Sequence, residues 1–459
     1  MNAQLIHELE KITSKDGVLT SPEDLAAYSY DATFEEHLPD VVVLPRSTQQ
    51  VSQVLMLASR ERIPLVTRGM ASGLAAGAVP LYGGIALSMT RMDRMLELDE
   101  KNAIEHVEAG MVTADLQAAV EARGLFYPPD PSSIRHSTIG GNIACNAGGP
   151  RCLKYGVTGD YVLGLTVVLA DGQILKTGGK AIKDVVGYDL KALFTGSEGT
   201  LGVITEALLR LIARPRFVRT ALVEFLSLDD AAVAVNAIIL SGIIPAAIEL
   251  MDSTAISCVE EAMQLGLPTD VEAILLIESD GQAEDVVTRQ IQQIAEICQS
   301  NGARKATLAR DEVERQSLWE ARRAVSPSLA RRAPNKLGED ITVPRSAIPE
   351  AVRQLRAVSA RYGLPIVIFG HAGDGNLHPN ILFDKRDPDQ WARVQQMVTE
   401  EFNIALALGG TLSGEHGVGA LKRPYMQSAL GSLSIEIQKR IKQALDPQNI
   451  LNPGKVLPD

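Results

Sequence analysis

Hydrophobic and polar positions in the N-terminal part of the chain predict alternating helices and strands. Residues 1–38 read as a helical lead-in, and the apolar run 40–45 predicts a short strand. Ser47 is placed to cap a helix that runs to about Arg62, since the apolar side chains after it recur at helical spacing. Residues 64–67 return as a strand, so this region is predicted to form a β-α-β unit.

The middle of the chain predicts a ferredoxin-like unit with the order β-α-β-β-α-β. A domain boundary is expected near residues 214–216, ahead of this unit. The predicted strands are 219–225, 246–251, 273–279 and 304–308, and the predicted helices are 229–240 and 283–300, with a polar stretch between the second and third strands.

Two further apolar segments, 365–370 and 376–383, read as strands joined by a glycine-bearing turn. In an extended segment Asn376, His378 and Asn380 share one face. Residues 388–408 predict a long amphipathic helix whose apolar stripe is most simply core.

Three of the seven histidines lie in the two short segments 371–378 and 413–419. Two strands joined by a turn could point His371 and His378 into one site. Neutral imidazole and carboxylate are usual ligands of zinc, iron or manganese. We therefore expect a metal held by His371, His378 and Glu415, with His416 left as a base. A single histidine is more often a satisfied core residue, but the cluster favours a site.

Composition excludes several classes of function. The chain has 459 residues, of which 46% are hydrophobic and 22% charged, as is typical of a globular protein. Its net charge of -12 argues against nucleic acid or an anionic membrane surface as the main partner. No apolar run approaches the ~20 residues of a transmembrane helix, and the N-terminus lacks a secretion pattern. We expect a cytoplasmic protein that can attach peripherally to a membrane complex.

The four cysteines, at positions 145, 152, 258 and 298, show no C-x-x-C pair and no iron–sulfur spacing. They are expected to be free thiols rather than a disulfide framework. Any iron–sulfur clusters that receive electrons must therefore lie on a partner.

Three segments rich in glycine and small residues, 68–77, 127–149 and 194–205, suit close approach of the backbone to a large ligand. The first follows a strand and can turn backbone N–H groups onto a phosphate. Residues 161–175 between them read as a hairpin with Asp171-Gly172 at its turn.

These three segments resemble the FAD-linked oxidases of the vanillyl-alcohol oxidase and p-cresol methylhydroxylase type. With segments 371–378, 414–419 and 445–455 added, the chain is similar to the branch that contains D-lactate dehydrogenase, D-2-hydroxyglutarate dehydrogenase and the FAD-linked subunit of glycolate oxidase. The resemblance runs from about residue 38 to 455. It implies an α+β fold with a two-part FAD-binding domain, a ferredoxin-like substrate or cap domain and a C-terminal helical segment.

The resemblance implies the boundaries 1–214 for the FAD domain, 215–410 for the cap domain and 411–459 for a segment that completes the active site. It also implies a set of FAD-binding residues: Arg68, Gly69, Ser72, Gly73, Leu74, Pro129, Asp130, Ser132, Thr138, Gly140, Gly141, Asn142, Ala144, Asn146, Gly148, Gly149, Tyr155, Gly156, Glu198, Gly199, Gly202, Val203, Ile204 and Asn452.

The first loop departs from the family pattern of consecutive glycines, since it reads Gly69-Met-Ala-Ser-Gly73. This loop has no histidine or cysteine, so non-covalent FAD is expected. His136 and Cys145, in the second segment, are the nearest alternatives as covalent linkers.

A basic run between residues 310 and 345 resembles the family segment that holds a substrate carboxylate. Most such charges are solvated, but Arg322 and Lys336 match the family positions, and an arginine fork suits a carboxylate. With Asn376 and His371 they form the expected substrate contacts. The implied reaction oxidises a D-2-hydroxy acid of the lactate, glycolate or 2-hydroxyglutarate type. The metal lowers the pKa of the alcohol, His416 takes its proton and hydride passes to flavin N5.

The electron acceptor is expected to be a quinone, an iron–sulfur subunit or an electron-transferring flavoprotein. Three other functions stay open at this point. One is an FAD-dependent transferase of the ether-lipid-synthase type, one is a non-haem iron oxygenase, which uses two histidines and a carboxylate, and one is a non-enzymatic binding module.

Overall fold

The computed structural model describes residues 1–458 and divides them into two compact units. The first unit contains Met1–Gly148, Val157–Arg214 and the C-terminal segment from Glu415. The second contains Pro215–Gly414 and a short insertion, Gly149–Gly156. The chain thus leaves the first unit for eight residues, returns to it, and enters the second unit again after Arg214.

The N-terminal part of the first unit is a small, mostly parallel sheet in the order β1-β2-β4-β3. Ser47 caps α3 by accepting from the backbone N–H of Gln50, as predicted, and strands β2 and β3 both pair in parallel with β4. Helices α1 and α3 cover the sheet with their apolar sides. The bounds are α1 Ala3–Thr13, β1 Val18–Leu19, α2 Pro22–Ala27, β2 Val41–Val43, α3 Thr48–Glu61, β3 Leu65–Arg68 and β4 Ile85–Ser88.

The rest of the first unit is an antiparallel sheet in the order β5-β6-β10-β8-β9, with a small pair, β7 and β11, beside it. The hairpin predicted over 161–175 is present as β8 and β9. The bounds are β5 Met95–Asp99, β6 Ile104–Glu108, α4 Thr113–Glu121, β7 Leu125–Phe126, α5 Ile139–Cys145, β8 Val162–Val168, β9 Ile174–Gly178, α7 Leu190–Phe194, β10 Val203–Arg210, β11 Ile212–Ala213 and α14 Met426–Leu445.

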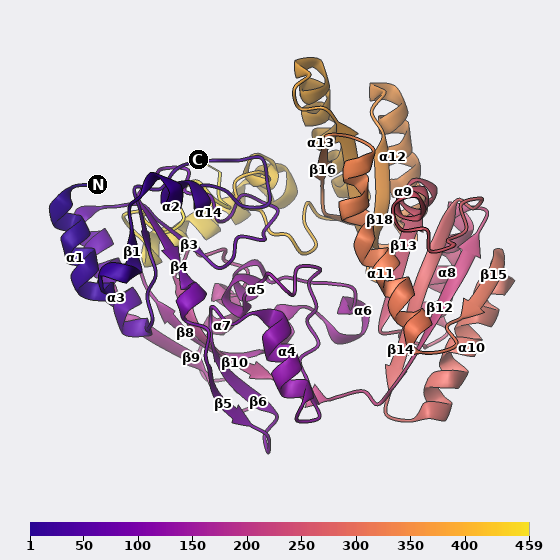
Figure 1. Ribbon diagram of the computed structural model, residues 1–459, viewed down its shortest axis with the longest axis horizontal. Helices are drawn as coiled ribbons and strands as arrows, with labels where there is room; N and C mark the ends of the chain where they lie inside the picture. The colour runs from indigo at the N-terminus through magenta and orange to yellow at the C-terminus, as the bar shows by residue number, and fades with distance from the viewer. Residues whose placement is uncertain (459) are drawn as a thin grey trace. The chain divides into compact units, whose positions relative to one another are not determined.

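The second unit is built on one sheet in the order β15-β12-β14-β13-β18-β19-β16, with the short β17 paired to β19 (Figure 1). Its elements are α6 Cys152–Tyr155, β12 Phe217–Phe225, α8 Leu228–Leu240, β13 Ala247–Asp252, α9 Ser253–Met263, β14 Ala273–Gly281, α10 Glu284–Ser300, β15 Ala303–Leu308, α11 Glu312–Ser328, β16 Asn335–Gly338, β17 Ile341–Thr342, α12 Ile348–Tyr362, β18 Ile366–His371, β19 Asn376–Phe383 and α13 Pro388–Ala407.

The first four strands of this sheet have the predicted ferredoxin-like order, which confirms that part of the prediction. Two features differ from the expectation. The polar stretch after β13 contains helix α9, capped by Asp252, and the sheet continues through β18 instead of ending at β13. Because pairing of β13 with β18 joins residues more than 110 positions apart, no local pattern could have predicted it.

Apolar side chains of α9 and α11 pack on one face of this sheet, against Met251, Ile274, Val367 and Phe369. Helices α8, α10, α12 and α13 form a second layer. The face covered by α9 and α11 is the one that carries the polar site described next.

Candidate active site

The two histidines of segment 371–378 lie on one face of the β18–β19 hairpin. Cross-strand pairing joins Phe369 to His378 and His371 to Asn376, so these four side chains share a face. The imidazole rings are perpendicular, at 87°, with centroids 5.1 Å apart. Their Nε2 atoms lie 3.4 Å apart. The hairpin therefore brings the two imidazoles together, as expected from the two extended segments.

A buried carboxylate, Glu249 on β13, orients the first imidazole. Its Oε1 lies 2.7 Å from Nδ1 of His371, and its Oε2 lies 2.6 Å from Nη2 of Arg322 on α11. Burial acts to raise the pKa of Glu249, but the positive charges of His371 and Arg322 outweigh it, so this pKa is lowered. In the neutral form of His371, Glu249 keeps the proton on Nδ1, and the lone pair of Nε2 faces His378.

Sequence reasoning missed Glu249. It pairs in register with His371 across two strands that lie far apart in the chain. The available signal was an acidic residue in the centre of the apolar segment 246–251, where burial of a charge demands a partner.

Asp340 is a second buried carboxylate that the sequence did not single out. It accepts hydrogen bonds from the side-chain amide of Asn376 at 2.7 Å, from the hydroxyl of Ser413 at 2.6 Å and from the backbone N–H of Gly414 at 3.0 Å. One of its oxygens lies 4.0 Å from Nδ1 of His378. Asp340 therefore fixes Asn376 and the 413–414 backbone beside the histidine pair, and both Asp340 and His378 carry atoms that a metal can bind.

Arg322 and Lys336, the two cations expected to bind a carboxylate, have different surroundings. Arg322 is buried, with its guanidinium 4.9 Å above the ring of Phe369, whereas the neighbouring Arg323 is exposed. Lys336 on β16 is half-buried and its ammonium contacts the hydroxyl of Ser326, one helical turn after Arg322. Burial lowers the pKa of Lys336. Both cations therefore lie along α11.

Asn380 lies on the same face of β19, and its amide donates to the backbone carbonyl of His378 at 2.9 Å. A side chain at Gly338, which pairs with Asn380 on β16, would place its Cβ 2.6 Å from the Asn380 amide oxygen. Close packing of β16 on β19 thus requires glycine here.

Glu415 and His416 follow Gly414 directly and begin the last segment of the first unit. The imidazole Nε2 of His416 lies 3.9 Å from the carboxylate of Glu415, and both residues are half-buried. An added Cβ on Gly414 would lie 2.4 Å from Thr342 Oγ1 and 2.6 Å from Asn376 Nδ2. Only one peptide unit, about 3.8 Å between Cα atoms, separates Glu415 from this anchored glycine.

The three segments expected to bind a cofactor converge within the first unit. An added Cβ on Gly69 would lie 2.3 Å from Thr138 Oγ1, so the first loop touches the start of α5. The loop at 196–199 joins the end of α5, because the N–H of Glu198 donates to the carbonyl of Ala144 at 2.8 Å. Asn452 connects the third loop to the first, since it donates to the Glu198 carbonyl and accepts from the N–H of Thr67.

The first loop has the form that an anionic ligand needs. Three of its carbonyls are used internally: Lys455 Nζ donates to Ala76 and Gly77, as well as to Val79 just after the loop, and the N–H of Ala420 donates to Ala75. In the described part of the chain, none of the backbone N–H groups of residues 69–77 donates to another protein group. An added Cβ on Gly73 would meet nothing within 4 Å. The loop therefore offers donors and space, and it fits a pyrophosphate.

Residues 138–149 contain helix α5, which their glycine-rich sequence does not predict. The hydroxyl of Thr138 caps it by accepting from the N–H of Gly141. An added Cβ on Gly140 would lie 2.6 Å from the Cβ of Ala109, so this glycine allows close helix packing. Capping and packing thus overrode the low helix propensity of glycine.

Several side chains of the expected FAD set are engaged inside the protein. The Arg68 guanidinium lies 5.0 Å from the ring of Tyr28 and donates to its carbonyl. Asn142 donates to the hydroxyl of Thr113, and the Glu198 carboxylate accepts from the N–H groups of Val418 and Gly419, both at 2.7 Å. Burial raises the pKa of Glu198. These side chains shape the loops.

The other members of the set lie in five places. Gly69, Ser72, Gly73 and Leu74 are in the first loop, and Leu74 is exposed. Pro129, Asp130 and Ser132 precede α5, and Thr138, Gly140, Gly141, Ala144, Asn146 and Gly148 are in or beside it. Gly199 and Gly202 precede β10, which begins with Val203 and Ile204. Gly149, Tyr155 and Gly156 belong to the insertion in the second unit, where the Tyr155 hydroxyl donates to Asp280 at 2.7 Å.

A nucleotide-binding unit and a mixed-sheet unit with a buried polar site together define a two-domain cofactor enzyme. Family comparison finds the same two parts: "FAD binding domain" matches residues 39–178 and "FAD linked oxidases, C-terminal domain" matches residues 214–456. The chain belongs to the FAD-linked oxidases, and its cofactor is FAD.

The relatives narrow the class further. Glycolate oxidase subunit GlcD of Bacillus subtilis is 48% identical over 94% of this chain and 91% of its own length. D-lactate dehydrogenase of Anaerostipes hadrus is 33% identical over 99% and 97%. Among solved structures, p-cresol methylhydroxylase superposes with a TM-score of 0.82 at 16% identity, covering 98% of this chain and 96% of that one, which shows the shared fold. No helix among the described residues is long and apolar enough to cross a membrane.

Proposed function

We propose that this chain is an FAD-linked dehydrogenase that oxidises a small D-2-hydroxy acid, such as glycolate, D-lactate or D-2-hydroxyglutarate, to the 2-oxo acid. The names of its relatives refer to acids of this kind. The observation that carries the proposal is the perpendicular pair His371 and His378, with Glu249 on the far nitrogen of His371. This arrangement is suited to binding and oxidising a substrate that has an alcohol beside its carboxylate.

Orientation of the substrate is assigned to two cations, Arg322 on α11 and Lys336 on β16, which contacts α11 through Ser326. Arg322 already shares a carboxylate with His371, so its charge is engaged by Glu249. Lys336 has only the neutral hydroxyl of Ser326 as a partner in the described residues, so its ammonium is the better candidate for the substrate carboxylate. Arg322 and Asn376 then support the pocket wall.

Proton removal is assigned to His416. An imidazole has an ordinary pKa near 6.5 and can accept the alcohol proton at neutral pH. Glu415, the adjacent carboxylate, stabilises the resulting imidazolium. The chain reaches Glu415 and His416 directly from Gly414, whose backbone N–H donates to Asp340.

Two bound groups complete the reaction. FAD, when bound, supplies the hydride acceptor. A divalent metal (zinc, iron or manganese) would be held by His371, His378 and Glu415, with Asp340 as a further oxygen donor, and would supply Lewis acidity at the substrate oxygens. Glu249 holds the His371 ring in the orientation that such a ligand requires.

The electrons are proposed to leave through a partner, namely an iron–sulfur subunit, an electron-transferring flavoprotein or a quinone. The Bacillus subtilis relative is named as one subunit of an oxidase, which supports a partner chain.

The proposal is tested by anaerobic titration of the purified holoprotein with D-lactate, L-lactate, glycolate and D-2-hydroxyglutarate, followed by absorbance near ~450 nm. One D-acid should bleach the flavin, and chelator treatment should abolish bleaching while FAD stays bound. Replacement His416→Gln should also abolish bleaching. The matched control is His106→Gln, a histidine of the antiparallel sheet paired with Glu206, which should bleach like the wild type.

A yellow protein that no acid bleaches would refute the dehydrogenase and favour the transferase alternative. Bleaching that survives the chelator would remove the metal from the proposal but leave the dehydrogenase standing. Bleaching by the His416→Gln variant at the wild-type rate would refute the assignment of the base.

A further inference from the structure

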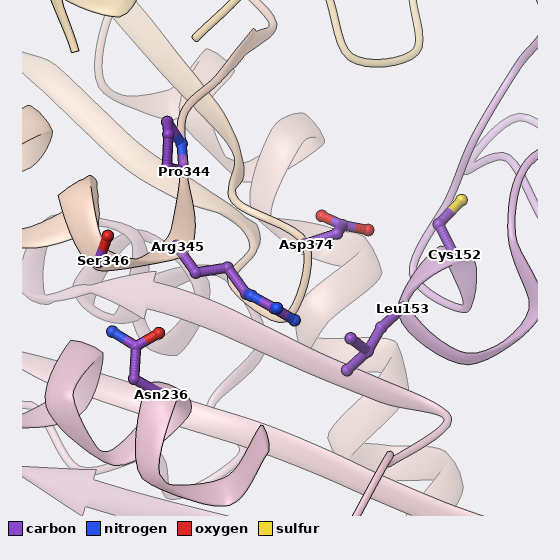
Figure 2. A pocket seen from close by; sticks show the side chains of 7 residues that line it. All are labelled: Cys152, Leu153, Asn236, Pro344, Arg345, Ser346 and Asp374. Carbon is purple, nitrogen blue, oxygen red and sulfur yellow. The ribbon is translucent and has the colours of Figure 1, made fainter. Parts of the chain in front are cut away.

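The antiparallel sheet of the first unit contains a carboxyl group that the proposed reaction does not use. Glu105, on β6, is 0% exposed. Neither of its carboxyl oxygens has a hydrogen-bond partner among residues 1–458. By contrast, Arg345 and Asp374 of the second unit line a cavity of about 580 Å³, where water can solvate their charges (Figure 2). Because an ionised carboxylate is costly to bury without a partner, Glu105 is buried as the neutral acid.

The strands on both sides of β6 give Glu105 apolar neighbours. It pairs with Leu98 on β5 and with Leu209 on β10, and side chains of directly paired residues lie on the same face of a sheet. The next residue on β10, Arg210, points to the opposite face, where its guanidinium lies 5.0 Å from the centre of the Tyr161 ring. The arginine therefore does not pair with the buried acid.

The charged group that acts on Glu105 in the described part of the chain has the wrong sign to stabilise its ionised form. This group is Glu97 of β5, itself an anion. His106 follows Glu105 on β6, but its side chain lies on the opposite face, with Nε2 3.1 Å from a carboxylate oxygen of Glu206. Burial, together with Glu97, raises the pKa of Glu105 from its ordinary value of 4.5 to about 7. The buried carboxyl group therefore changes its charge near neutral pH.

The chain that leaves β6 holds helix α5. Ala109 lies four residues after Glu105, about 13 Å along an extended chain. Its carbonyl accepts from the N–H of Gly140 at 2.7 Å. The hydroxyl of Thr113 accepts from the side-chain amide of Asn142 at 2.8 Å. Since α5 lies within the part of the chain that matches an FAD binding domain, a displacement of β6 reaches the segment expected to bind the cofactor.

Of the two strands beside β6, β5 is the one that can move. It is the edge strand of the sheet, and its pairing with β6 is irregular between Met95 and Glu97. Once Glu105 loses its proton, its carboxylate needs water or a hydrogen-bond donor. Separation of β5 from β6 admits water to the carboxylate, and β6 then loses one of the two strands that fix its position.

We propose that Glu105 is a proton-dependent switch for the retention of FAD. While Glu105 keeps its proton, β6 stays in register and holds α5 in the arrangement that binds the cofactor. When the proton is lost, the pairing of β5 with β6 opens and FAD leaves more readily. This switch goes beyond the proposed oxidation and does not depend on it, because it involves only the FAD-binding unit.

The test measures FAD release from the holoprotein between about pH 5 and 9, followed by the rise in flavin fluorescence. If FAD and the proton on Glu105 favour each other by one pKa unit, release should become about tenfold faster across this range. The rate should rise as a one-proton step with its midpoint near pH 7. Circular dichroism at each pH separates release of FAD from unfolding of the chain.

Two variants and a matched control assign the step to one residue. Glu105→Gln and Glu105→Leu cannot ionise, so both should keep FAD across the range; leucine also suits the apolar neighbours. The control is Glu401→Gln, which changes another buried glutamate whose oxygens lack a hydrogen-bond partner among residues 1–458, this one in the second unit. It should leave the step unchanged. Glu97→Gln removes the neighbouring negative charge and should move the midpoint to lower pH.

A second measurement observes the proton itself. A protonated carboxyl group has an infrared carbonyl stretch that disappears when the group ionises. The difference between the spectra of wild type and Glu105→Gln should contain this band in acid and lose it with a midpoint near pH 7.

A step in FAD release that both Glu105→Gln and Glu105→Leu retain would overturn the switch. It would also be overturned by a wild-type release rate that does not change with pH, by release that accompanies unfolding, or by an infrared band that is absent in acid. Bleaching of the flavin by a hydroxy acid at one fixed pH does not bear on these outcomes, so the proposed reaction is judged separately.

Discussion

Replacing Glu249 by Gln should destabilise the second unit more than any single surface change. The carboxylate is fully buried and holds two groups, Arg322 at 2.6 Å and His371 at 2.7 Å, while the Arg322 side chain is only 8% exposed. Glutamine keeps the shape but removes the charge, which leaves Arg322 buried without a counter-ion. Breaking such a pair from one side costs about 3–5 kcal/mol.

The assay is urea unfolding followed by tryptophan fluorescence. Both tryptophans of the chain, Trp319 and Trp391, lie in the second unit, so the signal reports the unit that contains Glu249. The control is Asp229→Asn, which breaks an exposed pair with Arg353, where both side chains are about half exposed. An exposed pair of this kind is worth about 0–1 kcal/mol.

The pH dependence gives an independent check. The pKa of Glu249 is lowered from its ordinary value of 4.5, so its contribution to stability is present above pH 4.5 and is lost as the pH falls through the lowered pKa. The difference between wild type and Glu249→Gln should therefore shrink only in acid. The double variant Glu249→Met with Arg322→Met should recover most of the loss, since it removes both charges. A Glu249→Gln variant within about 0.5 kcal/mol of wild type would refute the reasoning.

Three further changes test other parts of the structure. Glu401 on α13 is fully buried, and neither of its oxygens has a hydrogen-bond partner among residues 1–458. Burial, together with the nearby Glu339, raises its pKa. Stability should therefore fall as the pH rises above 4.5, by at most about 1.4 kcal/mol per pH unit, and Glu401→Gln should remove this slope in urea titrations from pH 5 to 9. Lys455→Met leaves three carbonyls in and just after the first loop, those of Ala76, Gly77 and Val79, without their donor. It should therefore speed FAD loss on dialysis, and retention at the wild-type level would contradict the role given to this lysine. Gly419→Ala places a Cβ 1.8 Å from the Ala75 carbonyl oxygen, at a residue with positive φ. In thermal melts it should prevent folding or lower stability by more than about 3 kcal/mol. The control Gly124→Ala also has a positive φ but open space around the added Cβ, so it should lower stability by only about 1 kcal/mol.

The expected metal site shows where sequence reasoning was strong and where it stopped. The pattern of segments 365–370 and 376–383 predicted two strands joined by a turn, which allows His371 and His378 to point into one site, and the observed pairing places both on one face. The partner of His371 could not be found this way. Glu249 is 122 residues away in the chain and meets His371 only through pairing of β13 with β18.

The sequence by itself determined the elements that rest on local physics: the Ser47 cap and its helix, the β8–β9 hairpin, the four ferredoxin-like strands and the glycine-bearing first loop. Tertiary structure decided the rest. Helix α5 forms in a glycine-rich segment because Thr138 caps it and Gly140 packs on Ala109. The eight-stranded sheet and the burial of Glu249 and Asp340 depend on contacts between segments far apart in the chain. Such contacts leave no periodic signal in the sequence, because they are set by how whole strands pair and by which helices cover the sheet.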